Sequence, residues 1–240
     1  MTRTEWQPAW LQTSAHRVDE ARVWRGVETQ YLSATTLLVD TVAEHDVLEG
    51  MLEASKPPLP AERMPGQHYL LVTPFRYAPQ RSSRFRAVGQ RGVWYGSREL
   101  RAACAEVAYW RMEFILDSIG LRDDKIVSQH TFFAAHVAGV GIDLTRPPWV
   151  AARAVWTDGR DYSGTQRLAA AATTAGIQVV QYESVRSPRD TNFAVFTPAA
   201  LTQPDGGLSA TQQPWDCIAM KERAIMVKRG DPSQRFEWER

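Results

Sequence analysis

Three polar residues of different chemistry stand at equal intervals in the sequence. Arg84, Tyr95 and Glu106 are separated by 95 − 84 = 11 and 106 − 95 = 11 residues, and a fourth polar residue, Ser184, follows 184 − 106 = 78 residues later. Arginine suits phosphate binding, because its fixed fork of donors matches two phosphate oxygens. These residues could therefore belong to one site for a phosphate-bearing ligand.

Glu106 lies in a predicted helix from about Arg98 to Asp117, at the flank of its apolar stripe. A surface glutamate on a helix usually pairs with Lys or Arg three or four residues away. Here those positions hold two alanines and two aromatic residues, Ala102, Ala103, Tyr109 and Trp110. The carboxylate lacks a local cationic partner, so a functional role and a solvated surface position are both open.

The other three residues each have a structural interpretation beside the functional one. Tyr95 belongs to a short predicted strand before Gly96, where a half-buried sheet tyrosine is common. Arg84 belongs to the basic segment RSSRFR, and such segments are usually solvated surface. Ser184 follows a predicted strand, where a serine often forms a turn, although loops at strand ends also carry site residues.

The elements that must position these residues change character along the chain. Residues 16–55 are helix-prone, and the proline-rich segment SKPPLPAERMPG ends the helix and forms a linker at about 55–66. Six later runs are rich in β-branched and aromatic residues and predict strands: HYLLVTPFRY, GVWYG, VSQHTFFAAHV, IQVVQY, NFAVFT and RAIMVK. Helices at about 98–117 and 163–176 interrupt them. Strands grouped with only two helices predict an α+β fold.

Composition narrows the class of protein. The chain has 240 residues, 44% of them hydrophobic, which is enough for one substantial core. A formal net charge of +1 does not indicate the positively charged surface that non-specific nucleic-acid binding needs. No apolar run approaches the roughly 18 residues that span a bilayer. Two cysteines allow neither a disulfide framework nor a zinc cluster, and His130 and His136 alone do not make a metal site. We expect a soluble cytoplasmic protein with no metal, direct nucleic-acid or membrane partner.

The order and spacing of the four candidates resemble the RES-domain family, which is named for its Arg, Glu and Ser. Short segments carry the resemblance: SSRFR with Arg84, GVWYGS with Tyr95, AACAEVAYWR with Glu106 and YESVR with Ser184. The TPFRY segment with Arg76 and the NFAVF strand also look like that family, and the resemblance spans about residues 67–201. One departure is that Ser82 and Ser83 stand where many members have glycines.

The resemblance implies a fold similar to ADP-ribosyltransferases, with a split β-sheet core and flanking helices. It implies an N-terminal helical extension at 1–60, without strands, and a RES-like catalytic domain at 67–240. It also implies that NAD is consumed as a substrate by the toxin of a bacterial toxin–antitoxin pair, whose partner is an Xre-like antitoxin. Homo-oligomers, or hetero-oligomers with the antitoxin, are expected.

The implied roles follow from cleavage of the bond between nicotinamide and ribose. Arg84, Tyr95 and Glu106 would form the catalytic group, with Glu106 opposing positive charge on the ribose carbon. Arg76 and Arg84 would bind the pyrophosphate. Tyr95 would stack against nicotinamide, and Ser184 would hold its amide or a nearby phosphate. Hydrolysis, phosphorolysis with phosphate as acceptor, and ADP-ribose transfer to a protein all stay open, as does a non-catalytic nucleotide-binding or partner-binding module.

Overall fold

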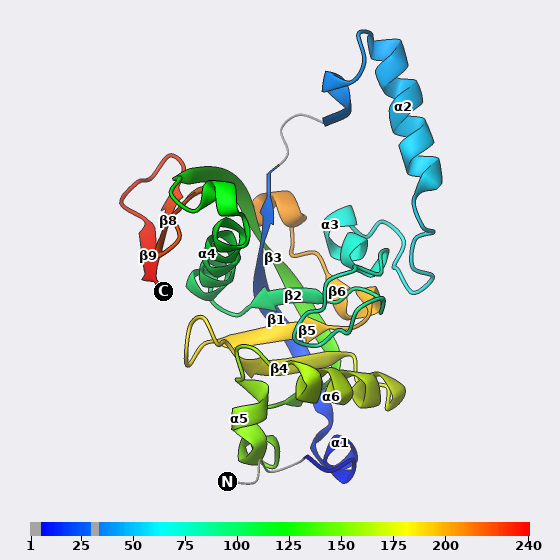
Figure 1. Ribbon diagram of the computed structural model, residues 1–240. Coiled ribbons are helices and arrows are strands. Elements are labelled where there is room, and N and C mark those ends of the chain that lie inside the picture. The colour runs from blue at the N-terminus through cyan, green and yellow to red at the C-terminus, as the bar shows by residue number, and fades with distance from the viewer. Residues whose placement is uncertain (1–5, 30–33) are drawn as a thin grey trace.

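The computed structural model of the protein describes residues 6–29 and 34–240. Helices and one large mixed sheet alternate irregularly along the chain, so the fold is α+β as expected (Figure 1). The strands are β1 (His16–Glu28), β2 (Trp94–Ser97), β3 (Ile126–Asp143), β4 (Val179–Glu183), β5 (Thr191–Val195), β6 (Leu201–Thr202), β7 (Gln213–Ala219), β8 (Arg223–Lys228) and β9 (Arg235–Glu239). The helices are α1 (Ala9–Ser14), α2 (Val42–Ser55), α3 (Tyr69–Val72), α4 (Leu100–Asp117), α5 (Arg153–Trp156) and α6 (Ser163–Thr174).

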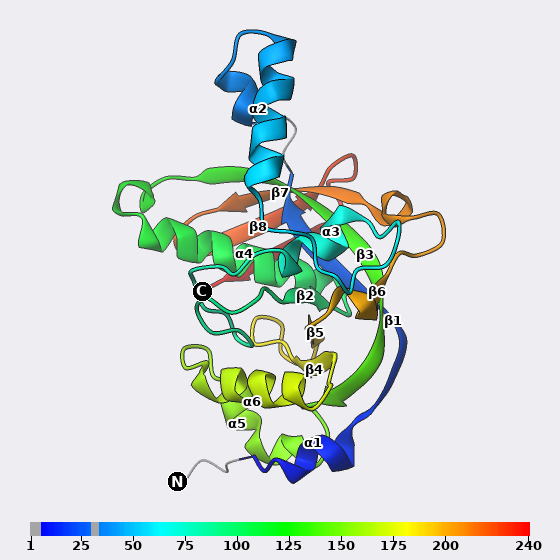
Figure 2. The same ribbon diagram turned by 90° about the vertical axis from the view of Figure 1, so that its right-hand side faces the viewer.

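Five of the strands form a closed ring of hydrogen-bonded ladders. β1 pairs antiparallel with β3 along nearly its whole length, and it meets β2 where Trp24 lies opposite Ser97. β2 then pairs with β5, β5 with β4, and β4 with the far end of β3. The long curved pair of β1 and β3 is visible along one side of the molecule in Figure 2. All five strands contribute to one apolar cluster, which includes Val23, Trp94, Phe133, Val179 and Phe193.

β3 also carries an open part of the sheet, on which α4 packs. β7 pairs with the first half of β3, and β8 and β9 follow it in order. α4 lies beside these strands (Figure 1) and buries a face made mainly of small residues: Ala102, Ala103, Cys104, Ala105, Ala108, Met112 and Ile115. Small side chains let the helix approach the sheet closely. The predicted helix is confirmed, and Cys104 is a buried residue of its inner face.

A third apolar cluster lies among α1, α5 and α6, beside β4 (Figure 2). Trp149, Trp156 and Leu168 are among its fully buried members. The indole Nε1 of Trp156 donates to the carbonyl of Trp149 at 2.8 Å, so the buried ring is also hydrogen-bonded. This cluster fixes the short helix α5, whose last residue, Trp156, contributes its carbonyl to the site described below.

The N-terminal segment differs from the predicted helical extension. Residues 42–55 do form α2, with a capping box at Thr41 and Glu44, but residues 16–28 form a strand of the sheet. The expectation of no strand before residue 60 is therefore wrong. A bulge between Val18 and Ala21, with Glu20 at a φ of +34°, interrupts the alternation that would have identified the strand. A boundary at residue 60 would also separate β1 from the core to which it belongs.

The segment HYLLVTPFRY is not a strand either. It forms α3 and a 3-10 turn at 73–75, because the His68 ring accepts a hydrogen bond from the Leu70 amide and caps the helix. Leu71, Val72 and Phe75 share one buried helical face. The other five predicted strands are confirmed as β2, β3, β4, β5 and β8, whereas β1, β6, β7 and β9 are additional.

α2 contributes least of the longer helices to the core. It projects away from the sheet in both views, and none of its residues is buried (Figures 1 and 2). Its apolar side chains Val47 and Met51 are exposed. Within residues 6–29 and 34–240, no helix combines the length and the apolar character needed to cross a membrane.

Candidate active site

One cavity lies between α4, the strands β1 and β2, and the loops around residues 81–84 and 185–186. Its volume is about 580 Å³, within the range of ordinary small-molecule sites. α4 lines it with one face, through Ala103, Glu106, Val107, Trp110, Glu113, Phe114 and Asp117. At 1.5 Å per residue, the cavity follows this helix for about 20 Å. It is therefore long enough for an extended ligand.

Three of the five residues predicted from the sequence line this cavity, namely Arg84, Tyr95 and Glu106. Arg76 does not. Its guanidinium donates to a carboxylate oxygen of Glu53 on α2 at 2.8 Å and to the carbonyl of Pro57 at 2.5 Å. This arginine ties the proline-rich segment to α2, and we do not place it in the site.

Glu106 is held by two donors on a single carboxylate oxygen. Ser184 Oγ donates to Glu106 Oε1 at 3.2 Å, and Asn192 Nδ2 donates to the same oxygen at 2.8 Å. Within the described part of the chain, no hydrogen bond is formed to Oε2. One oxygen thus fixes the side chain, while the other is free to act on a ligand in the cavity.

The protonation of Glu106 is balanced between opposing effects. Burial raises the pKa of this carboxyl above its usual range. The hydrogen bonds from Asn192 and Ser184 oppose that shift, because they favour the charged form. The positive charges of Arg186 and Arg84 act in the same direction. The charge of Glu106 therefore depends on the groups around it.

Tyr95 is fixed at both ends. Its hydroxyl lies 2.8 Å from Ser83 Oγ and accepts a hydrogen bond from the Phe85 amide at 3.1 Å. Its carbonyl accepts from Arg25 at 2.8 Å. Burial raises the pKa of the phenol, so the ring is neutral at physiological pH. A rigid, neutral aromatic ring in a cavity is suited to stacking against a flat ligand group.

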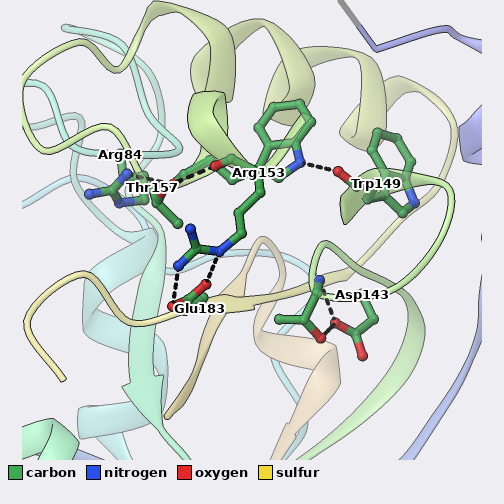
Figure 3. Close-up of polar contacts among 8 residues, drawn as sticks. Arg84, Asp143, Trp149, Arg153, Thr157 and Glu183 are labelled. Atoms are coloured by element: carbon green, nitrogen blue, oxygen red, sulfur yellow. Dashed lines mark hydrogen bonds and ion pairs between the residues drawn. The ribbon is translucent and has the colours of Figure 1, made fainter. Parts of the chain in front are cut away.

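Arg84 is oriented by the end of α5. Its Nη1 donates to the carbonyls of Trp156 and Asp158 at 2.7 and 2.8 Å, and its guanidinium lies over the Tyr162 ring, 4.8 Å from the centroid. Figure 3 shows Arg84 beside Thr157 at this end of α5. The segment is oriented further by the Trp156–Trp149 hydrogen bond. The other nitrogens of Arg84 stay available for a ligand in the cavity.

α5 is also tied to the strand that leads to Ser184. Arg153 forms two hydrogen bonds with Glu183, both 2.7 Å long (Figure 3). Such bidentate pairs fix geometry as well as contributing energy. Because Glu183 directly precedes Ser184, the supports of Arg84 and Glu106 are joined into one framework.

Ser184 is buried beside Glu106 and is not part of the cavity lining. It is 1% exposed, does not line the cavity, and receives a hydrogen bond from the Ser187 amide at 3.0 Å while it donates to Glu106. In this arrangement the serine contacts the glutamate that lines the cavity and orients its carboxylate. Its predicted contact with the nicotinamide amide or a phosphate stays a prediction without geometric support.

Sequence reasoning missed three residues of the site. Asn192 is a buried amide next to Thr191 at the start of β5, and a polar residue directly before the apolar run FAV was the available signal. Arg186 lines the cavity, with its guanidinium 3.3 Å from the centroid of the Tyr109 ring. Arg25 lines it from β1, which the sequence did not identify as a strand.

The two histidines singled out in the sequence are not in contact with each other. His130 lines the cavity and lies 2.9 Å from Ser128 Oγ, whereas His136 lies 3.2 Å from a carboxylate oxygen of Glu20. Burial and the positive charge of Arg111 lower the pKa of His130 to about 4, so its ring is neutral at pH 7. Among residues 6–29 and 34–240, no group of three potential metal ligands occurs.

Comparison with known proteins identifies the family. The model of the RES domain matches residues 60–217, which is 217 − 60 + 1 = 158 of the 240 residues. Among solved structures, the M. tuberculosis MbcT–MbcA toxin–antitoxin complex is similar, with 13% identity, a TM-score of 0.48, and coverage of 89% of this chain and 92% of that chain. A search of curated proteins gives no significant match. Because the family match covers well over half of its length, the chain belongs to the RES-domain family.

Proposed function

We propose that the protein is an enzyme that cleaves the bond between nicotinamide and ribose in NAD. The observation that carries the proposal is the environment of Glu106, a mostly buried carboxylate held on one oxygen by Ser184 and Asn192. It lines the same cavity as Arg84 and Tyr95. A carboxylate in such a position is suited to stabilising a positive charge that develops during a reaction.

The proposed reaction needs few protein groups. As the C–N bond breaks, its electron pair leaves with nicotinamide, and positive charge develops on the ribose carbon, as in glycoside cleavage. Glu106 would oppose this charge and hydrogen-bond the ribose hydroxyls. Nicotinamide leaves as a neutral molecule, so no general acid is required. The acceptor, water or phosphate, forms the new C–O bond and gives up a proton to solvent.

The remaining residues would position the substrate. The nitrogens of Arg84 that do not donate to the carbonyls of Trp156 and Asp158 would bind the pyrophosphate, supported by the charge of Arg186 on the same cavity. The ring of Tyr95 would stack against nicotinamide. Holding the substrate in reactive geometry increases the rate, because the translational and rotational entropy of the reacting groups is already lost on binding.

A toxin role follows from this activity. Loss of NAD harms the cell that makes such an enzyme, so the active protein needs a neutralising partner. We infer that the partner is an Xre-like antitoxin, as is typical of the family, and that it inserts a segment into the cavity. Harmless overexpression of the isolated protein, with cellular NAD unchanged, would contradict this role.

The test of the proposed function is release of nicotinamide from NAD by the purified protein and by its Glu106→Gln variant. Glutamine keeps the shape and the acceptor oxygen for Ser184 and Asn192 but removes the charge. Turnover should fall by about 10²–10³, the usual scale for one well-placed electrostatic contact, while NAD affinity changes little. Near-normal turnover in the variant would remove Glu106 from the mechanism.

The acceptor can be identified in the same assay. Reactions run with and without inorganic phosphate separate phosphorolysis from hydrolysis, and labelled NAD with cell lysate reveals transfer to a protein. A wild-type protein that binds NAD but releases no nicotinamide under any of these conditions would be a nucleotide-binding module and not an enzyme.

A further inference from the structure

An arginine outside the family match also lines the cavity. Arg25 lies on β1, whereas the RES-domain match covers residues 60–217. Alternate residues of β1 beyond the bulge, including Val23 and Val27, pack against the apolar cluster shared by the ring of strands. Arg25 stands between these two valines on the same face of the strand. A guanidinium thus occupies a position on this face of β1 whose neighbours, Val23 and Val27, are apolar.

Arg25 uses only part of its hydrogen-bonding capacity within the protein. Its Nη1 donates to the Tyr95 carbonyl at 2.8 Å, and its guanidinium lies over the Trp94 ring, 5.5 Å from the centroid. A guanidinium has five N–H donors. Within residues 6–29 and 34–240, no further acceptor and no carboxylate contacts it, and none of its nitrogens is buried without a partner. Arg25 itself forms part of the cavity lining, so these unoccupied donors belong to a residue that borders the ligand space.

The charge of Arg25 also lacks a counter-charge in the described residues. Burial lowers the pKa of Arg25 to about 10, which reflects the cost of removing its charge from water. Arg111, which lines the same cavity, differs because it forms an ion pair with Glu28. Arg25 is half-buried, and an unpaired charge that is partly removed from water carries a cost that an anionic ligand would offset.

We propose that Arg25 is a second phosphate-binding group of the cavity, separate from Arg84. Tyr95 lies between the two: Arg25 holds its carbonyl, whereas its hydroxyl is held by the loop that carries Arg84. The ligand is a phosphate group, which could belong to NAD or to free inorganic phosphate. The inference rests on the proposed function for the identity of the dinucleotide, but not for the chemistry of the group bound.

Two variants of Arg25 and one matched control test this assignment. Arg25→Met removes the charge and donors, and Arg25→Lys keeps the charge but loses the fork. Arg22→Met is the control, because Arg22 also lies on β1 over a tryptophan ring but is exposed and does not line the cavity. Affinities for ADP-ribose, inorganic pyrophosphate and inorganic phosphate are measured by calorimetry, together with the kcat/KM for cleavage of nicotinamide riboside, which has no phosphate.

Arg25→Met should bind at least one of the phosphate ligands about 10- to 100-fold more weakly, the scale of a hydrogen bond between charged partners. Arg25→Lys should lie between it and the wild type, and Arg22→Met should match the wild type. Cleavage of nicotinamide riboside should change much less than binding of the phosphate ligands. Equal affinity of Arg25→Met and wild type for all three phosphate ligands would overturn the proposal, and so would an equal loss for the riboside, which would assign Arg25 to holding Tyr95.

A measurement on the wild type decides the matter if the Arg25 variants do not fold. The Nε–Hε resonance of Arg25, assigned through its backbone, should shift as ADP-ribose, pyrophosphate or inorganic phosphate is added, and an unchanged resonance at saturation would overturn the proposal. The ligand that shifts it at the lowest concentration identifies the source of the phosphate. A shift of the Arg25 resonance without any nicotinamide release would support the role of Arg25 and contradict the proposed function. Release of nicotinamide from NAD without a shift would support the proposed function and contradict the role of Arg25.

Discussion

The hydroxyl of Ser184 donates to Glu106 Oε1 at 3.2 Å, across 78 residues of sequence. The serine has no surface in the cavity, so its contribution reaches a ligand only through the carboxylate that it orients. The bond favours the ionised form of Glu106 and lowers a pKa that burial raises. We therefore expect Ser184 to act as a positioning residue, a role that can be tested separately from substrate binding.

Ser184→Ala should raise the pKa of Glu106 further, because one of the hydrogen bonds to the charged form is lost. Turnover should then fall on the acid side at a higher pH than in the wild type, with little change in KM. Profiles of kcat against pH measure this shift. Ser187→Ala is the matched control, because that buried serine donates to Asp190 and not to Glu106. A profile unchanged in Ser184→Ala would contradict the positioning role.

Glu106→Gln should stabilise the protein at neutral and alkaline pH. The folded-state pKa of Glu106 is raised, so its contribution to stability is fully present below the unfolded-state pKa and is lost as pH rises through the folded-state value. Glutamine does not ionise, so the variant keeps its stability as the pH rises. Thermal unfolding should give a higher Tm for the variant at pH 8, and the difference should shrink towards pH 4. A lower Tm for the variant at pH 8 is the opposite outcome and would argue against a destabilising buried charge.

Arg84→Ala and Arg76→Ala should differ in their effect on ligand affinity. Arg84 lines the cavity, so its loss should weaken binding of ADP-ribose by about 10- to 100-fold. Arg76 is bound to Glu53 and Pro57, so its loss should leave that affinity unchanged. Calorimetric titration of both variants measures the difference. Weaker binding of ADP-ribose by Arg76→Ala would support the original prediction that Arg76 binds the substrate.

Val23→Asp should destabilise the whole protein, because β1 is a strand of the core. Val23 is 0% exposed, and an unpaired charge there should cost about 3 kcal/mol or more. Arg22→Asp, at the neighbouring exposed position, should cost much less. Urea denaturation gives both free energies of unfolding. Equal, small losses would mean that the N-terminal strand is an appendage, as an N-terminal extension would be.

Residues with a strong local pattern were predictable from the sequence. The helix around Glu106 has apolar residues at three- and four-residue steps, and β5 is a short run of apolar residues next to a turn. β1 had no such pattern, because its bulge shifts the alternation and Arg25 takes an inward position. Tertiary pairing with β3, which no local signal encodes, decides its conformation.

The site was predictable in part for the same reason. Arg84, Tyr95 and Glu106 line one cavity, whereas the contacts of Ser184 and Arg76 appear only in the folded chain. The distance from Ser184 to Glu106 follows from where the chain beyond β4 lies relative to α4, and that arrangement cannot be derived from spacing. A residue type and its order in the chain indicate a candidate, but they do not distinguish a ligand contact from support of a neighbouring side chain.

The ring closed by β1 and β3 sets when the candidate site can first form during synthesis of the chain. His16 lies opposite Gly141 and Glu28 opposite His130, which are separations of 141 − 16 = 125 and 130 − 28 = 102 residues. Contacts between such distant segments form late, because the loop between them must close first. Asn192, which holds Glu106, lies later still in the chain. A nascent chain on the ribosome therefore has no complete site until most of its length has emerged, and any activity of that site would begin only when synthesis is nearly finished.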